Sequence, residues 1–242
     1  MAVPKTKSND LIQTLYPSLC TGELLISEVE LYGVMRDAKK LPIDYQAYSI
    51  EGLCLMLKGK FDEGCDLCER AIMLAPENTT TWINYAILLN NLDKPQKMNS
   101  LLHRAVRIRD FEILKQCIVH AAFWVDYELL KEAKMISQFD ERLTDDIKSA
   151  IKTYDVLSQD ESLALDLQKT AKIVMAIAED EKLRASSSFV EDDGEGTVSY
   201  NLCVKVDSGS ELSRLNDRII KEMVAAGLEM TNCVAFFEPE VA

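Results

Sequence analysis

Histidine is scarce in this chain of 242 residues, which contains only His103 and His120. The two lie 17 positions apart (120 − 103 = 17), on different predicted helices, and neither belongs to an H-E-x-x-H metal motif. The sequence also lacks a glycine-rich loop that would cradle a phosphate and a G-x-S-x-G nucleophile motif. We therefore predict that the protein is not an enzyme and has no catalytic residue, cofactor or metal site.

Positive charge is also in short supply, because 27 Lys and Arg residues stand against 40 Asp and Glu residues, a net charge of −13. A groove that binds nucleic acid needs a basic face to hold the phosphates. The composition therefore argues against a nucleic-acid partner. The acidic excess indicates a solvated acidic surface, and it also suits a basic partner protein.

Long apolar runs are absent as well. The longest uninterrupted ones, such as residues 173–178, are far too short to span a bilayer, and the first ten residues lack the apolar core of a signal peptide. The seven cysteines are irregularly spaced and mostly have apolar neighbours, which is typical of reduced core residues. Cys65 and Cys68 form a C-x-x-C inside a predicted helix, without a second pair of metal ligands. We predict a cytoplasmic protein with no membrane partner.

What the sequence does contain is a pattern in residues 45–110 that returns once at a spacing of 34 (82 − 48 = 34). The returning pairs are Tyr48 and Trp82, Gly52 and Ala86, Leu55 and Leu89, Cys68 and Leu102, Ala71 and Ala105, and Leu74 and Ile108. This period is the length of a helix–turn–helix repeat that stacks on copies of itself. The pattern predicts helices at about 44–58, 61–74, 79–91 and 95–108.

These residues resemble a pair of tetratricopeptide repeats (TPRs). The resemblance implies a TPR-like α-solenoid of helical hairpins, and an activity in binding other proteins through a concave groove. Carried over by register, the groove residues would be Ser49, Leu53, Met56, Ile83, Asn84, Ile87, Asn90 and Asn91.

The predicted groove is mostly apolar and edged by amides. A groove that clamps a terminal carboxylate would carry lysines and an arginine, and of its pattern only Asn84 matches here. The strip therefore suits an apolar or amphipathic segment of a partner protein. The alternative is that the groove is filled by the chain itself, either by the helix predicted at 158–184 or by the C-terminal unit.

The segments around the repeat are also predicted to be helical. Residues 9–19 and a helix after Gly22 form a hairpin, which we interpret as a degenerate terminal unit. The second of these helices has an apolar stripe, typical of a core face, made of Leu25, Val29, Tyr32 and Met35. Beyond the repeat, helices are predicted within 110–139 and at about 144–156 and 158–184.

The composition changes at residue 185, where a small, acidic, glycine-containing segment indicates a linker at 185–196. Alternating residues from Val198 to Val206, a capped helix ending at Gly227 and a strand at 230–237 then predict a β-α-β unit at 197–242. Two strands are marginal by themselves. We therefore expect this unit to form a joint sheet with a second chain, either a copy of itself or the partner.

The sequence thus predicts a mainly α protein, with a TPR-like helical domain at 1–184, a linker and a β-α-β interaction unit. The predicted function is that of a cytoplasmic, non-enzymatic protein-binding adaptor or scaffold. Two alternatives remain open. The first is an acidic inhibitor, antitoxin or secretion chaperone of one protein partner. The second is an accessory subunit of an enzyme complex, or an enzyme whose site is not recognised.

Overall fold

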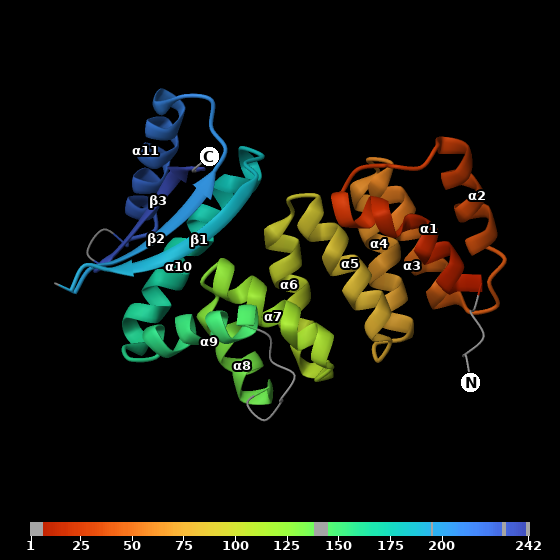
Figure 1. The fold of residues 1–242 in the computed structure, drawn as a ribbon, viewed down its shortest axis with the longest axis horizontal. Helices are drawn as coiled ribbons and strands as arrows, with labels where there is room; N and C mark the ends of the chain where they lie inside the picture. The colour runs from red at the N-terminus through yellow and green to blue at the C-terminus, as the bar shows by residue number, and fades with distance from the viewer. Residues whose placement is uncertain (1–6, 138–144, 195, 229–230, 241–242) are drawn as a thin grey trace. The chain divides into compact units, whose positions relative to one another are not determined.

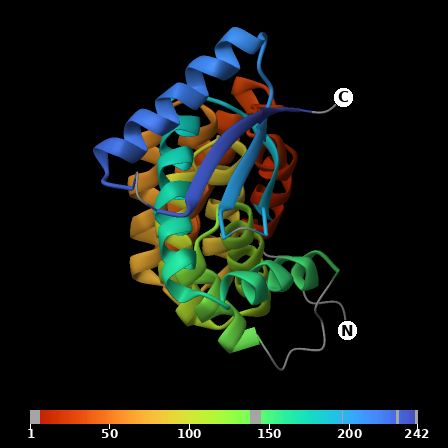
Figure 2. The same ribbon diagram turned by 90° about the vertical axis from the view of Figure 1, so that its left-hand side faces the viewer.

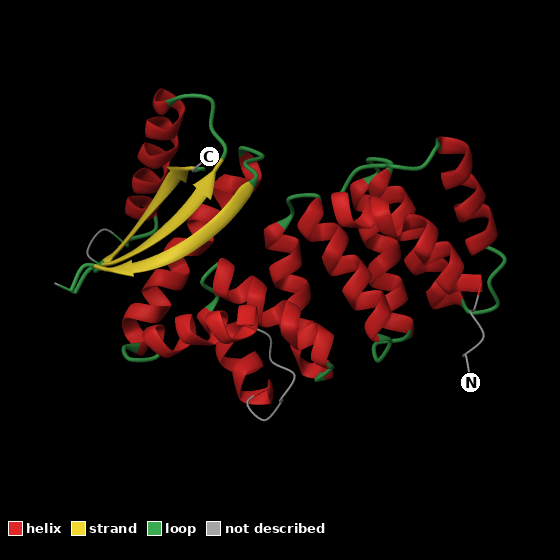
Figure 3. Cartoon of the chain, in the orientation of Figure 1, coloured by secondary structure: helices red, strands yellow, loops and turns green. Residues whose placement is uncertain are grey.

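The computed structural model describes residues 7–137, 145–194, 196–228 and 231–240. It is mainly helical, with a small three-stranded sheet near the C-terminus (Figure 1, Figure 3). The chain divides into two compact units, Met1–Lys94 and Pro95–Ala242. This boundary differs from the predicted one at residue 185. It falls between the third and fourth helices of the predicted repeat pair, so the second repeat does not lie within one unit.

The first unit consists of five helices among its described residues. They are α1 (Lys7–Thr21), α2 (Glu28–Ala38), α3 (Asp44–Leu57), α4 (Phe61–Leu74) and α5 (Thr79–Asn91). The starts of α2 and α5 are fixed by side-chain caps. Ser27 and Glu30 form a capping box on α2, and the Asn78 side chain accepts a hydrogen bond from the Thr81 backbone N–H on α5.

The α3–α4 hairpin confirms the helices predicted at 44–58 and 61–74. The small residues at 52 and 71 are both buried in it, as the repeat pattern predicted. Cys54, Cys65 and Cys68 also lie in this core, and burial raises the pKa of Cys54 to about 12. A thiol held neutral in this way behaves as a small apolar side chain.

The second unit begins with helices and ends in the sheet. Its elements are α6 (Pro95–Ala105), a 3-10 turn (Val106–Ile108), α7 (Phe111–Phe123), α8 (Tyr127–Ser137), α9 (Asp145–Leu157), α10 (Glu161–Asp180), β1 (Ala185–Asp192), β2 (Val198–Val204), α11 (Gly209–Ala225) and β3 (Cys233–Pro239). The strand order is β1-β2-β3, with β1 antiparallel and β3 parallel to β2. No helix in the described ranges is long and apolar enough to cross a membrane.

One face of the sheet packs on helices and forms the core of this unit. Tyr200 and Leu202 of β2 and Phe237 of β3 are buried there. They share a cluster with Leu167 of α10 and Ile219 of α11. In Figure 2, α10 and α11 are seen beside the strands, and each of the two helices packs against β3 and against the other.

The expectation of a linker at 185–196 is wrong for residues 185–192, which form strand β1. Every residue of this strand except Ser186 has a partner on β2, so the third strand of the sheet comes from within the chain. The sequence obscures the strand because an edge strand needs few apolar residues. Only Ala185, Phe189 and Val190 are apolar in its eight positions. The structure therefore contains a three-stranded sheet from one chain, in place of the expected two strands that would need a second chain.

Candidate functional site

The eight residues predicted to line a groove lie on α3 and α5, and half of them are buried. Leu53 and Met56 are 0% and 2% exposed, and Ser49 and Asn84 are each 6% exposed. Ile83, Ile87 and Asn91 are partly buried, and Asn90 is exposed. The apolar centre of the predicted strip is therefore not accessible to a partner in this structure.

Helix α1 contributes to this burial because it packs against both α3 and α5, while the Met56 side chain packs on Gly64 of α4. Its side chains Leu15 and Leu19 are fully buried. The Asn91 side-chain amide donates a hydrogen bond of 2.9 Å to the carbonyl oxygen of Leu19. Part of the strip is covered by α1, a segment of the same unit, whereas the alternative drawn from the sequence named the helix at 158–184 and the C-terminal unit.

A different surface is exposed on the second unit, on the face of the sheet opposite its core. Side chains alternate between the two faces of a strand, so Asn201 points away from its buried neighbours Tyr200 and Leu202. The register pairs Asn201 with Phe189 on β1 and with Phe236 on β3. We call this face of the sheet, with its central row Phe189–Asn201–Phe236, the outer face.

The two aromatic side chains of the outer face are open to solvent, at 36% exposed for Phe189 and 41% for Phe236. Asn201 between them is only 3% exposed, and its side-chain amide donates a hydrogen bond of 2.9 Å to the Ser199 hydroxyl oxygen. The centre of the row is thus polar and fixed, while its two ends present aromatic rings. Such rings bury a large apolar area when a partner covers them.

An acidic cavity of about 500 Å³ lies beside the aromatic row. It is lined by Glu191, Asp192, Asp193, Thr197, Ser199 and Val234. Glu191, Ser199 and Val234 are paired across the three strands, and they form the row next to Phe189–Asn201–Phe236. Successive rows on one face of a sheet are about 7 Å apart. The cavity and the aromatic row therefore form one continuous surface.

Backbone hydrogen bonds fix two of the carboxylates at this cavity. The Asp192 side chain accepts from the Gly194 N–H at 2.8 Å, and the Asp193 side chain accepts from the Thr197 N–H at 3.0 Å. Both bonds lie within the turn between β1 and β2, so the turn positions the charges. Three acidic side chains around one cavity favour a positively charged occupant.

A second polar cluster lies between α6, α7 and α8. Asp126, which is 2% exposed, accepts hydrogen bonds from the His103 ring Nε2 at 2.7 Å and from the Asn99 amide at 2.8 Å. It also accepts from the Leu129 N–H at 3.0 Å and so caps α8. Burial alone would raise the pKa of Asp126, but these hydrogen bonds outweigh it and hold the pKa at about 2.

The residues around Asp126 carry strain and an unsatisfied group. Val125 has a φ of 52°, in the left-handed region that a β-branched residue rarely adopts. The ring of His120 is buried, its Nε2 has no hydrogen-bond partner among the residues that the structure describes, and burial lowers its pKa to about 4. The bond to Asp126 raises the pKa of His103 instead. The pair of His103 and Asp126 joins α6 to the start of α8. Within the described residues no group of three His, Cys, Asp or Glu side chains is placed to hold a metal ion.

The surface residues of the outer face were not identified from the sequence. The sequence places Phe189 in the predicted linker and Phe236 in a predicted strand, and it does not show which side of that strand Phe236 is on. The alternation of residues 198–204 contained the usable signal, because it places Tyr200 and Leu202 on one side of β2 and Asn201 on the other. The facing of Phe236 follows only when the parallel register of β2 and β3 is known.

Comparisons of the chain with protein-family models, with curated proteins and with solved structures found no match.

Proposed function

We propose that this chain is a cytoplasmic, non-enzymatic protein-binding adaptor, and that it holds its partner on the outer face of the C-terminal sheet. The observation that carries the proposal is the exposed pair Phe189 and Phe236 on a sheet whose other face is buried. The TPR-like helices of the first unit serve as a scaffold in this interpretation. The six buried cysteines suit the reducing conditions of the cytoplasm.

The charges beside the aromatic row define the chemistry of the partner. A Lys or Arg side chain fits the cavity lined by Glu191, Asp192 and Asp193, because its charge opposes theirs and its stem is apolar. Apolar side chains of the same segment then lie on Phe189 and Phe236. Glu238, which is paired with Cys203, lies on the other side of the aromatic row, so acidic side chains border this row on both sides.

The spacing of the two features fits an ordinary peptide. The cavity row and the aromatic row are about 7 Å apart, which is the distance between residues i and i+2 of a strand. Residues i and i+4 of a helix are separated by about 6 Å. A segment with a basic residue and an apolar residue at either spacing engages both features at once.

A binding measurement with a defined probe tests the proposal. The probe is a fluorescent synthetic peptide of alternating Lys and Leu residues, and fluorescence anisotropy with the full-length chain gives the dissociation constant. Replacing Phe189→Ser and Phe236→Ser together should weaken binding at least tenfold. The matched control replaces Met73→Ser and Met135→Ser, two exposed apolar residues on helices, and should leave binding unchanged.

The acidic cavity is tested separately with the same probe. Glu191→Gln with Asp192→Asn removes two charges but keeps acceptor oxygens for the turn, and it should weaken binding severalfold at low salt. Glu77→Gln with Glu112→Gln, at two exposed positions away from the sheet, is the charge-matched control. Equal affinity of the outer-face variants and the wild-type chain would contradict the proposal.

The same cavity favours one narrower function. An acidic inhibitor, antitoxin or secretion chaperone that holds a single basic protein would use this surface in the same way. Affinity purification followed by mass spectrometry separates the two functions. One stoichiometric basic protein supports the narrower function, and several partners that share a basic and apolar motif support the adaptor.

A further inference from the structure

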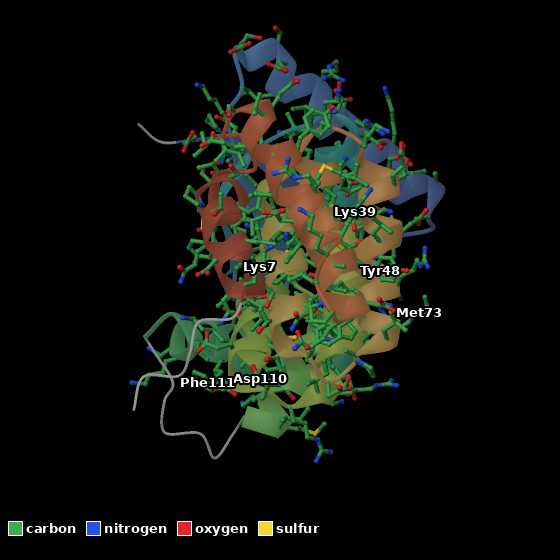
Figure 4. The ribbon with its side chains drawn as sticks, turned by 90° about the vertical axis from the view of Figure 1, so that its right-hand side faces the viewer. Lys7, Lys39, Tyr48, Met73, Asp110 and Phe111 are labelled. Carbon is green, nitrogen blue, oxygen red and sulfur yellow. The ribbon has the colours of Figure 1, made fainter. Side chains whose placement is uncertain are left out.

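Helix α2 leaves one of its sides uncovered. Leu31, Val34 and Ala38 form its buried side. On the opposite side Val29 is 82% exposed and Tyr32 is 51% exposed. Leu25, which precedes the helix, is 55% exposed. Three residues of the stripe that the sequence predicted as a core face are thus at the surface, and the fourth, Met35, is half-buried. Figure 4 views the chain from the side on which α2 lies, with Lys39 labelled just after the helix.

Gly33 lies in the middle of α2, on the same outward side as Val29 and Tyr32. Glycine inside a helix lowers helix stability, so it is expected where another backbone must approach closely. A Cβ added to Gly33 would meet no atom within 4 Å. Nothing in the described part of the chain therefore uses the space that this glycine leaves open.

The charges of α2 are divided between its ends. Glu28 and Glu30 lie in its first turn, and Arg36, Lys39 and Lys40 lie at its end. Asp37 is the exception at the basic end, where it pairs with Lys40 at 3.0 Å and with Arg36 at 3.7 Å. Lys39 pairs with Glu51 at 3.5 Å. All of these basic side chains are largely exposed, so their ion pairs are weak. These side chains can therefore leave their present partners and pair with carboxylates of another chain.

We propose that this side of α2 is a dimer interface, in which α2 of a second copy packs antiparallel across a twofold axis. An antiparallel pair places the acidic start of each helix against the basic end of the other. Such a surface is complementary to itself, which selects a copy of this chain over an unrelated protein. The apolar stripe is then buried against its copy, and the two Gly33 positions allow the backbones to approach.

The interface is small, because a helix of 11 residues is only about 16 Å long. Dimers of this size are weak, so we expect a dissociation constant on the order of micromolar. Sedimentation equilibrium of the full-length chain from about 1 to about 500 μM covers this range. The wild-type chain should pass from monomer to dimer as its concentration rises.

Two substitutions test the surface directly. Val29→Glu introduces a charge into the stripe, and Gly33→Leu fills the space between the helices. Each should raise the dissociation constant at least tenfold, while circular dichroism shows an unchanged helix content. Ile220→Glu, at a 57% exposed position on α11, is the matched control and should leave the dimer intact.

A charge exchange tests the antiparallel arrangement. Glu28→Lys alone and Arg36→Glu alone should each weaken the dimer, because each homodimer then brings like charges together. A mixture of these two variants should form a heterodimer at least as tight as the wild-type dimer, since every opposed pair is again of opposite sign. A chain that stays monomeric at all concentrations overturns the proposal. A dimer unaffected by Val29→Glu and Gly33→Leu, or no recovery in the mixture, overturns it as well.

Discussion

Gly52 of α3 and Gly64 of α4 lie against each other's backbone. A Cβ added to Gly52 would be 2.7 Å from the carbonyl oxygen of Gly64, and a Cβ added to Gly64 would be 2.6 Å from the carbonyl oxygen of Gly52. Both carbonyls belong to helices and cannot move independently. The α3–α4 hairpin therefore depends on two glycines at one crossing point.

The first prediction concerns this crossing. Gly64→Ala should lower the free energy of unfolding of the first unit by about 1–3 kcal/mol, because the added methyl group forces the helices apart. Urea unfolding followed by the fluorescence of Trp82, in a Trp124→Phe background, measures this unit alone, because the chain has two tryptophans. Gly33→Ala at dilute protein concentration is the control, and it should be neutral or stabilising by up to about 1 kcal/mol. If Gly64→Ala and Gly33→Ala changed the free energy of unfolding equally, α3 and α4 would not be in close contact at Gly52 and Gly64.

The repeat spacing was sufficient to predict this hairpin. The small residues at 52 and 71 recur at 86 and 105 because close helix contacts require them, so a sequence period reports a packing geometry. The period could not show that α1 covers the strip on α3 and α5. An open apolar groove and a groove filled by the chain's own helix have the same residues, and only their contacts differ.

The second prediction concerns the junction that holds α1 in place. Gly22 ends α1 with a φ of 72°, and a Cβ there would be 2.1 Å from the carbonyl oxygen of Asn91. Gly22→Ala therefore adds a clash to the strain of the left-handed conformation, and it should destabilise the first unit. Gly59→Ala is the control, because Gly59 has a φ of 83° and no atom within 4 Å of the added Cβ. Gly22→Ala should cost at least about 1 kcal/mol more than Gly59→Ala. Equal losses in urea unfolding would show that α1 is not fixed by this contact.

The third prediction replaces an expectation drawn from the open groove. If the strip predicted as a groove were open, Leu53→Glu with Ile87→Glu would abolish partner binding and preserve the fold. Because Leu53 is fully buried, the double substitution should instead unfold the first unit, as an unpaired buried charge costs several kcal/mol. Circular dichroism and the Trp82 fluorescence of the variant report the loss. Asn90→Asp, at an exposed position of the same strip, should leave both signals unchanged. If the double variant stays folded, the strip is in contact with solvent and α1 does not cover it.

The C-terminal sheet shows a different limit of sequence reasoning. Strand β2 was predicted because large apolar residues occupy every second position from Val198 to Val206. The sequence pattern does not reveal strand β1, because it lies at an edge, where it is held by backbone pairing with β2 and polar side chains are tolerated. The pairing of Phe189 with Asn201 depends on the turn between the strands, and apolar periodicity does not report that turn.

The last prediction concerns the pH dependence of the second unit. His120 has a pKa of about 4 in the folded chain because it is buried, and an ordinary pKa of about 6.5 when the chain unfolds. Between pH 6.5 and 4 the unfolded chain binds a proton at this residue and the folded chain does not. The free energy of unfolding should therefore fall as the pH falls through this window. The two neighbours titrate elsewhere. The stabilisation from His103, whose pKa is raised, is complete below pH 6.5, and that from Asp126 is lost only as the pH falls from about 4 toward 2.

Urea unfolding at pH 7 and pH 5, followed by the fluorescence of Trp124 in a Trp82→Phe background, measures the effect of His120. Between pH 7 and pH 5, the free energy of unfolding of the second unit should fall by roughly 2 kcal/mol more in the wild-type chain than in the His120→Leu variant. The variant binds no proton at this position. The comparison of the two losses cancels the contribution of surface carboxylates, which are the same in both chains. His103→Asn is the second control. It removes the ion pair with Asp126 but leaves His120 buried, so its loss between pH 7 and pH 5 should be at least as large as that of the wild-type chain. If the free energy of unfolding fell equally in the wild-type and His120→Leu chains, the prediction would be wrong. The buried ring of His120 would then accept its proton in the folded chain, and its Nε2 would have a hydrogen-bond partner there.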